Sequence, residues 1–151
     1  LLGALKGELN DSLYSKVTGK AFHDSKNTHD LIMEHNINQA LIKSVSNNVI
    51  KTVQTISKGG LALALCNLYL KLENRFGLKV HVSRKIPDSE LLFGESYGSA
   101  LITIGERELM EFQRICMSYG IPSSTIGRLY ETPEVRVNDI ITVNGKVLDS
   151  I

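Results

Sequence analysis

The sequence predicts one α+β domain spanning residues 1–151, in which helices pack against a mixed β-sheet. In three long stretches, apolar side chains recur at the 3-4 spacing of a helix. Short apolar or alternating runs, of the length of strands, lie between these stretches. A length of 151 residues suits a single hydrophobic core, and the chain shows no internal repeat and no linker. We therefore expect strands and helices to alternate through the middle of one domain.

The first third of the chain is expected to contain one strand, one helix and a second strand. Residues 13–17 form a short apolar piece between loops rich in Gly, Asn and Ser, which favours a strand. A helical pattern begins at Thr28, and the Asn47-Asn48 pair is expected to end it. Residues 51–56 alternate polar side chains with Val and Ile, which indicates a strand.

A strongly apolar helix is expected next, capped by Ser57 or by one of the glycines after it and ended by Gly77. Its apolar face comprises Leu61, Leu65, Leu68, Leu72 and Phe76. The remaining elements are a strand over 78–82, a loop or short helical turn over 87–93, a strand over 100–104 and a helix over 106–119. The tail, 125–148, predicts two or three short strands with a turn at Asn144-Gly145.

Composition excludes several classes of function. The formal charge of +1, the absence of Trp and the 6% aromatic content argue against nucleic-acid binding. No apolar run reaches the roughly 20 residues of a membrane-spanning helix, so we expect no membrane association. Cys66 and Cys116 lie in separate helical patterns, which indicates two buried thiols without a disulfide and a cytoplasmic location. His23, His29 and His35 recur every six residues and do not share a helix face, so no metal site is expected.

The first segment that could carry chemistry is the glycine turn Ser57-Lys58-Gly59-Gly60, which lies between a predicted strand and a predicted helix. Backbone N–H groups at a helix start attract anions, glycines allow close approach of a ligand, and Lys58 could add a positive charge. The Gly-Lys-Ser/Thr ending of a P-loop is absent. The alternative is a tight strand-to-helix turn with a purely structural role.

The second segment, residues 94–98, contains the pattern Gly-x-Ser-x-Gly of serine hydrolases. A nucleophile elbow requires a helix after the serine, whereas a strand is predicted from about residue 99. The hydrolase order also requires a later histidine, and the last histidine is His81. The segment is therefore either a structural loop or a loop that binds a ligand through Glu95 and Ser96.

Together these segments resemble the C-terminal, AIR-synthase-related domain of the phosphoribosylformylglycinamidine synthase large-subunit family. The resemblance lies in SKGGLALA at 57–64, LFGESYG at 92–98 and YGIPSSTIG at 119–127, with GELNDSLY at 7–14 similar to the opening of that domain. It covers nearly the whole chain. The glycine motif is shared with related ATP-using enzymes, whereas LFGES with the Gly-Ile-Pro turn is more particular to the synthase.

The resemblance implies the function of a larger enzyme. The family amidates formylglycinamide ribonucleotide in purine biosynthesis with ATP and Mg²⁺, using ammonia from glutamine and a phosphorylated intermediate. The implied partners are the other domains of the synthase and its glutaminase subunit, with possible self-association of the excised domain. The family's catalytic histidine lies in earlier domains, so no catalytic residue and no synthase turnover are expected here. The implied nucleotide- or phosphate-binding residues are Ser57, Lys58, Gly59, Gly60, Gly94, Glu95 and Ser96.

The chain departs from the family at four ligand-relevant positions. Thr55 and Lys58 stand where the glycine motif has acidic residues, and neither can act as a carboxylate ligand of Mg²⁺. Tyr97 and Ser99 stand where members often have Gln and Arg, so the guanidinium that could bind phosphate bidentately is missing. The family scaffold is expected to be retained while its ligand chemistry has changed.

Two other readings remain open. One is a domain of another enzyme of the superfamily, such as aminoimidazole ribonucleotide synthase, selenophosphate synthetase or a hydrogenase-maturation protein. The other is a non-catalytic interaction or regulatory domain that reuses the fold. The chain opens on Leu1 without Met, so we expect a longer parent chain. An exposed apolar surface is then also expected.

Overall fold

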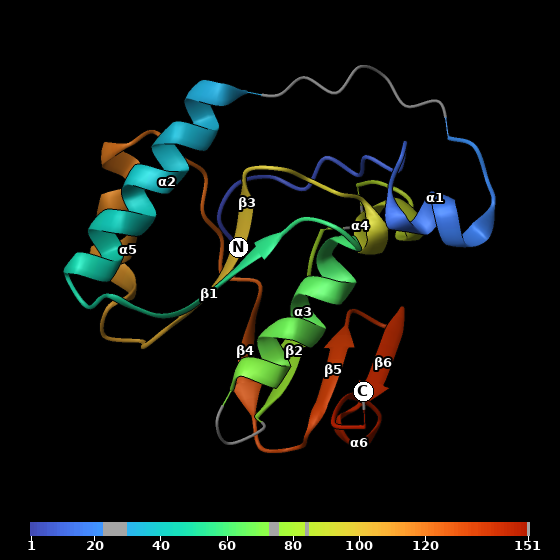
Figure 1. The fold of residues 1–151 in the computed structure, drawn as a ribbon. Helices are drawn as coiled ribbons and strands as arrows, with labels where there is room; N and C mark the ends of the chain where they lie inside the picture. The colour runs from blue at the N-terminus through green and yellow to red at the C-terminus, as the bar shows by residue number, and fades with distance from the viewer. Residues whose placement is uncertain (23–29, 73–75, 84, 151) are drawn as a thin grey trace.

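The computed structural model describes residues 1–22, 30–72, 76–83 and 85–150 (Figure 1). Helices and strands alternate through the middle of the chain, as the sequence predicts. In chain order the elements are α1 (Leu13–Thr18), α2 (Leu31–Ser46), β1 (Ile50–Ile56), α3 (Gly60–Lys71), β2 (Gly77–Val80), α4 (Asp88–Phe93), β3 (Ser99–Ile104), α5 (Leu109–Ser118), β4 (Gly127–Tyr130), β5 (Glu134–Val137), β6 (Ile141–Asn144) and α6 (Gly145–Leu148).

The strands of the described residues form two sheets. Strands β1 and β3 pair as an antiparallel ribbon, in which Val53 faces Ile102. The second sheet has the strand order β4-β2-β5-β6, with β2 and β5 parallel and the other neighbours antiparallel. The predicted α+β class with a mixed sheet is confirmed, although the ribbon lies apart from the four-stranded sheet.

The helices and the two sheets enclose two hydrophobic cores. In Figure 1, α3 lies across the four-stranded sheet, while α2 and α5 lie side by side next to the ribbon. The first core gathers residues from α3, the larger sheet and one end of the ribbon, including Leu61, Leu65, Tyr69, Val135 and Leu101. The second gathers residues from α2, α5 and the other end of the ribbon, including Ile37, Ala40, Ile50, Phe112 and Cys116. The ribbon therefore takes part in both cores.

The first predicted strand is wrong, because residues 13–18 form the helix α1. The Ser12 hydroxyl accepts a hydrogen bond from the Ser15 N–H at 3.1 Å, which caps the helix start. Gly19 ends the helix in the left-handed conformation, with φ 67°. Local capping thus decides the structure of a segment too short for its apolar pattern to distinguish helix from strand.

Two glycines also differ from their predicted roles. Gly77 does not end a helix: α3 ends at Lys71, and Gly77 begins β2, where a Cβ would lie 1.9 Å from the Thr132 carbonyl oxygen. Phe76 therefore lies outside α3 and is 36% exposed. The predicted turn at Asn144-Gly145 is the start of helix α6, because the Asn144 side chain accepts the Lys146 N–H at 2.9 Å.

Three exclusions made from the sequence can be compared with the structure. Cys66 is half-buried and Cys116 buried, both are free thiols, and burial raises the pKa of each. Within the described ranges, no three His, Cys, Asp or Glu side chains form a group that could hold a metal, while His23 and His29 lie outside those ranges. None of the described helices has the length and apolarity that crossing a bilayer requires.

Candidate functional site

The glycine turn and the loop that follows α4 are in direct backbone contact. Gly60 has a φ of 66°, and a Cβ at this position would lie 2.6 Å from the Phe93 carbonyl carbon and 2.7 Å from the Leu92 carbonyl oxygen. Only glycine therefore allows α3 to start at this distance from the neighbouring loop. At Gly60, the space next to the glycine that could admit a phosphate is filled by the backbone of residues 92–94.

The opening segment of the chain packs on the same loop. A Cβ on Gly94 would lie 2.5 Å from the Cα of Gly7 and 2.4 Å from the Glu90 carbonyl oxygen. Gly7 itself has a φ of 74°, which favours glycine. Three of the segments that carry the family resemblance, residues 7–14, 57–60 and 92–96, thus converge in space.

Glu95 holds these three segments together. Its Oε1 accepts the Leu13 N–H at 2.7 Å and the Gly59 N–H at 3.1 Å. Its own N–H donates to the Glu8 carbonyl at 2.9 Å, and the residue is only 7% exposed. A carboxylate is the strongest acceptor that a side chain can offer to backbone N–H groups at helix starts. An internal carboxylate therefore occupies the anion position at the start of α3.

Ser96 is also engaged by the chain. Its side chain is fully buried, and its Oγ accepts the Lys6 N–H at 2.8 Å. The neighbouring Ser99 hydroxyl donates to the Ala4 carbonyl at 2.8 Å. Strand β3 begins at Ser99, so the segment after Ser96 is not the helix that a nucleophile elbow requires. The geometry agrees with the exclusion of a serine hydrolase.

The remaining positions of the glycine turn differ in exposure. Ser57 is half-buried, and its carbonyl accepts the Gly60 N–H at 3.0 Å, which closes the turn. Gly59 and Gly60 are buried, whereas Lys58 and Thr55 are exposed. Lys58 is therefore the cation of this turn that a ligand in solvent could reach. Neither Thr55 nor Lys58 supplies a carboxylate, and Oε1 of the Glu95 carboxylate at this turn already accepts two backbone N–H groups. The residues present therefore do not fit Mg²⁺.

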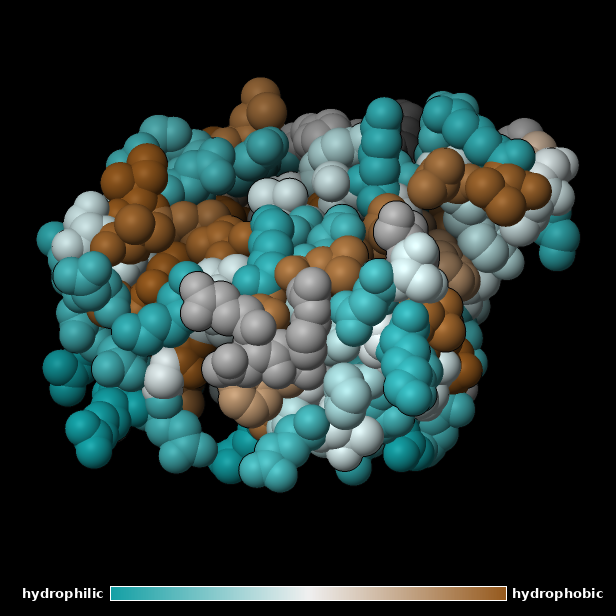
Figure 2. Space-filling model, turned by 60° about the horizontal axis from the view of Figure 1, so that its bottom comes forward, coloured by the Kyte–Doolittle hydropathy of each residue, from teal (hydrophilic) through white to brown (hydrophobic). Residues whose placement is uncertain are grey.

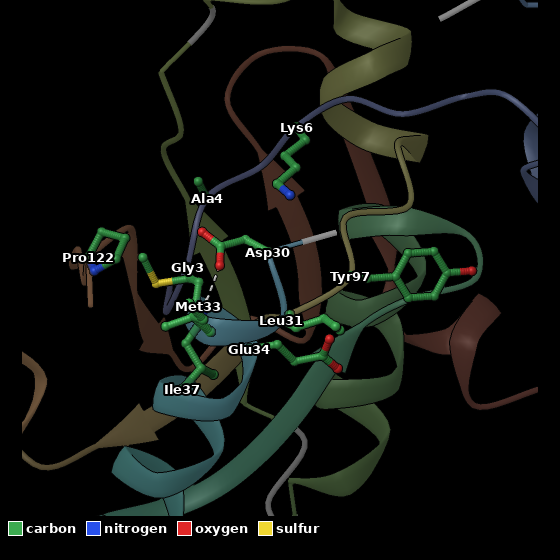
Figure 3. Close-up of a pocket in the computed structure, with 12 residues that line it drawn as sticks. Gly3, Ala4, Lys6, Asp30, Leu31, Met33, Glu34, Ile37, Tyr97 and Pro122 are labelled. Carbon is green, nitrogen blue, oxygen red and sulfur yellow. Dashed lines mark hydrogen bonds between the residues drawn. The ribbon is translucent and has the colours of Figure 1, made fainter. Parts of the chain in front are cut away.

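A cavity of about 720 Å³ opens next to the Tyr97-Gly98 turn, which follows Glu95 and Ser96 (Figure 3). The sequence did not predict this cavity. Its wall combines residues 3–6, the first turns of α2 and the Tyr97-Gly98 turn. Asp30, on its rim, caps α2 by accepting the Met33 N–H at 2.9 Å. The lining comes from segments far apart in the sequence, and no motif signals their proximity. The residues that line it are Gly3, Ala4, Lys6, Asp30, Leu31, Ile32, Met33, Glu34, Ile37, Tyr97, Gly98 and Pro122.

The α+β fold and the convergence of the motif segments define the class of domain. The chain belongs to the family described as AIR synthase related protein, C-terminal domain, whose model matches residues 6–140. It is 28% identical over 146 residues to the phosphoribosylformylglycinamidine synthase subunit PurL of Thermoanaerobacter sp. (strain X514), covering 97% of this chain and 19% of that protein. With the PurL subunit of Cutibacterium acnes it shares 28% identity over 148 residues, covering 95% of this chain and 19% of that protein. The chain thus spans about a fifth of the length of these relatives.

Solved structures confirm the fold. The structure of PurLQS from Thermotoga maritima aligns with a TM-score of 0.70 at 19% identity, over 82% of this chain and 23% of that one. Thermotoga maritima PurL complexed with ADP aligns with a TM-score of 0.69 at 20% identity, over 80% of this chain and 22% of that one. Both alignments extend the resemblance seen in the motifs to the arrangement of helices and strands.

Proposed function

We propose that this chain is the C-terminal AIR-synthase-related domain of a phosphoribosylformylglycinamidine synthase, a ligase of purine biosynthesis. The parent enzyme would convert formylglycinamide ribonucleotide to its amidine with ATP and ammonia from glutamine. The main support for this proposal is that the family's motif segments converge on Glu95, in a chain whose matched relatives are PurL subunits. Thermotoga maritima PurL is known in complex with FGAR and with ATP, which supports the proposed substrates.

The domain's role in this proposal is architectural. The Glu95 carboxylate and the Ser96 hydroxyl bind the chain's own backbone, and we assign them the role of holding these loops in place. Within the described ranges no cluster of acidic side chains offers a metal site, and we assign Mg²⁺ to other domains of the parent enzyme. The 151-residue chain is expected to have no synthase activity of its own.

Contact with nucleotide phosphates is proposed at the exposed edge of the glycine turn. Lys58 is solvent-exposed beside Ser57, Gly59 and Gly60, and Gly94 and Glu95 lie against the same turn. A single lysine supports only weak, salt-sensitive binding. Titration with ADP and with phosphate, followed by NMR, should shift the amides of residues 57–60, and Lys58→Ala should remove the shift. Lys51→Ala, at an exposed position of β1, is the matched control.

The proposed partners are the remaining domains of the synthase and its glutaminase subunit, in the cytoplasm. The existence of a PurLQS assembly in Thermotoga maritima supports partner subunits. Figure 2 shows hydrophobic residues open to solvent on the left of the molecule, the side of α2 and α5 in Figure 1. The exposed apolar side chains of these two helices include Ile42 and Val45 of α2 and Met110 and Met117 of α5. Such a surface also favours self-association of the isolated domain.

Activity measurements test the proposal directly. The purified 151-residue chain, given ATP, formylglycinamide ribonucleotide and ammonia, should yield no amidine product. The full-length product of the gene should catalyse this reaction, and removal of the region corresponding to residues 1–151 should abolish it. Product from the isolated chain, or an unchanged rate after removal of the region, would contradict the proposal.

A further inference from the structure

The outer edge of strand β3 is only partly used. On one side β3 pairs with β1 along its whole length. On the other side, within the described residues, the recorded pairing is a single antiparallel bridge between Ala100 and Leu2. In this bridge the Leu2 N–H donates to the Ala100 carbonyl at 2.8 Å, and the Ala100 N–H donates to the Leu2 carbonyl at 3.0 Å.

The backbone geometry of a strand defines what lies beyond this bridge. Successive residues direct their N–H and C=O groups to opposite sides of a strand. Because Ala100 faces Leu2, Ile102 and Ile104 turn their N–H and C=O groups to the same outer side. Leu101 and Thr103 turn theirs toward β1. The outer edge of β3 therefore offers the hydrogen-bonding positions of Ile102 and Ile104 to a further strand.

A cleft of about 500 Å³ lies along this edge. One wall contains Leu65 and Leu68 of α3, and another contains Leu109 and Phe112 of α5, so the cleft is apolar on two sides. At its rim, Glu106 and Arg128 form an exposed ion pair at 3.2 Å. Residues 123–129 also line the cleft. An extended segment with apolar side chains on both faces matches these walls.

We propose that this cleft receives an extended apolar segment that adds to β3 as an antiparallel strand, and that this segment is the stretch of the longer parent chain leading into Leu1. The identity of the segment rests on the proposed function, which makes the domain part of a larger enzyme. The bridge between Leu2 and Ala100 fixes the direction of this segment. Because the pairing is antiparallel, residues that precede Leu2 lie next to residues that follow Ala100, from Leu101 to Ile104. The first residue before Leu1 faces Ile102, and the third faces Ile104.

The surroundings of Leu1 support this placement. Its nitrogen donates to the Ser124 carbonyl at 2.8 Å, and its carbonyl accepts the Ser124 N–H at 2.9 Å, so Leu1 already lies in strand geometry. Burial lowers the pKa of the Leu1 amine to about 6, because an ammonium group loses hydration there. A peptide N–H in the same position carries no charge and avoids this cost. Leu1 and Leu2 also begin the apolar pattern that the cleft walls require.

The first experiment uses the 151-residue chain with designed N-terminal extensions. One extension is Val-Val-Val-Val, which places apolar side chains on both faces of the added strand. The matched control places proline at the first and third positions before Leu1, because proline lacks the N–H that would donate to the Ile102 and Ile104 carbonyls and its ring prevents regular pairing of the segment with β3. Amide exchange is followed by NMR, with Leu101 and Thr103 as internal references that already pair with β1. With Val-Val-Val-Val, exchange at Ile102 and Ile104 should slow about tenfold, the order of one backbone hydrogen bond. The proline extension should leave it unchanged.

Unchanged exchange at Ile102 and Ile104 with both extensions would overturn the inference that the cleft accepts a strand. Protection that rises with protein concentration in the unextended chain would assign the cleft to a second copy and would also overturn it. A second experiment extends the chain by the residues that its gene encodes immediately before Leu1. Protection with the designed segment but not with the natural one would refute the natural segment as the occupant. A gene without upstream coding sequence would refute the proposed parent enzyme, while the result with the designed extension would stand.

Discussion

Replacement of Glu95 tests whether one buried carboxylate holds the motif segments together. In Glu95→Ala, the N–H groups of Leu13 and Gly59 lose their acceptor in a site that excludes water. Hydrogen bonds to a charged group contribute about 1.5–3 kcal/mol each, and two such bonds are lost. We expect the free energy of unfolding to fall by about 3–5 kcal/mol.

Glu95→Gln separates charge from shape. Both N–H groups donate to the same Oε1, so a glutamine oxygen can accept both bonds without the negative charge. Neutral hydrogen bonds are about half as strong as charged ones, and the loss should be about 1–2 kcal/mol. The order wild type, Gln, Ala therefore reports how much of the stabilisation is electrostatic.

Urea unfolding followed by circular dichroism measures these differences. Glu106→Ala is the control, since Glu106 forms an exposed ion pair with Arg128 and its loss should change stability by less than about 0.5 kcal/mol. If Glu95→Ala unfolds at the same urea concentration as wild type, Glu95 does not hold the three segments. If Gln and Ala variants are equally destabilised, the negative charge accounts for the whole effect and the argument from geometry fails.

Three further predictions concern packing and protonation. Gly94→Ala should lower the free energy of unfolding by about 3 kcal/mol or more, because its Cβ would collide with Gly7 and Glu90, whereas Gly120→Ala, with open space but φ 64°, should cost only about 1 kcal/mol. Equal denaturation midpoints for the two variants would refute the close contact. Ser96→Ala should cost about 1–3 kcal/mol in the same assay, because the Lys6 N–H loses its acceptor, and a loss below about 0.5 kcal/mol would show that water replaces it. The Leu1 amine has a folded pKa of about 6 against 8.0 unfolded, so the unfolded chain binds more protons in this window and stability should rise by about 2 kcal/mol from pH 6 to pH 8. N-terminal acetylation should remove that rise, and a rise of equal size in the acetylated chain would assign it to other groups.

The sequence predicts those features that follow from local pattern or from motifs. The helices α2 and α5 and the strands β1 and β3 are confirmed, because each has a clear apolar period and recognisable end residues. The apolar period also predicts α3, but this helix ends at Lys71 and not at Gly77. The segment 13–18 was too short for its period to be decisive, and the contact between Ser12 and Ser15 determines its structure. The cavity beside α2 and the cleft beside β3 could not be predicted, since each is lined by segments that only the tertiary fold brings together.

The sequence also could not decide whether the glycine turn binds a ligand. From spacing alone, Gly59 and Gly60 suit either an anion site or a tight turn. The choice depends on Glu95, which lies 36 residues away from Gly59 and contributes the carboxylate. Sequence reasoning singled out both segments as candidate ligand sites, but no rule of local spacing indicates that one would bind the other.

The separation of the Glu95 contacts along the chain has a kinetic consequence. Glu95 bonds to Leu13 across 82 residues and to Gly59 across 36 residues. Contacts that close such long loops cost much chain entropy and tend to form after the local helices and hairpins. The Glu95 bonds are therefore expected to be absent from the folding transition state. Loss of the carboxylate should then leave the folding rate nearly unchanged and accelerate unfolding, so that Glu95 determines mainly how long the folded domain survives.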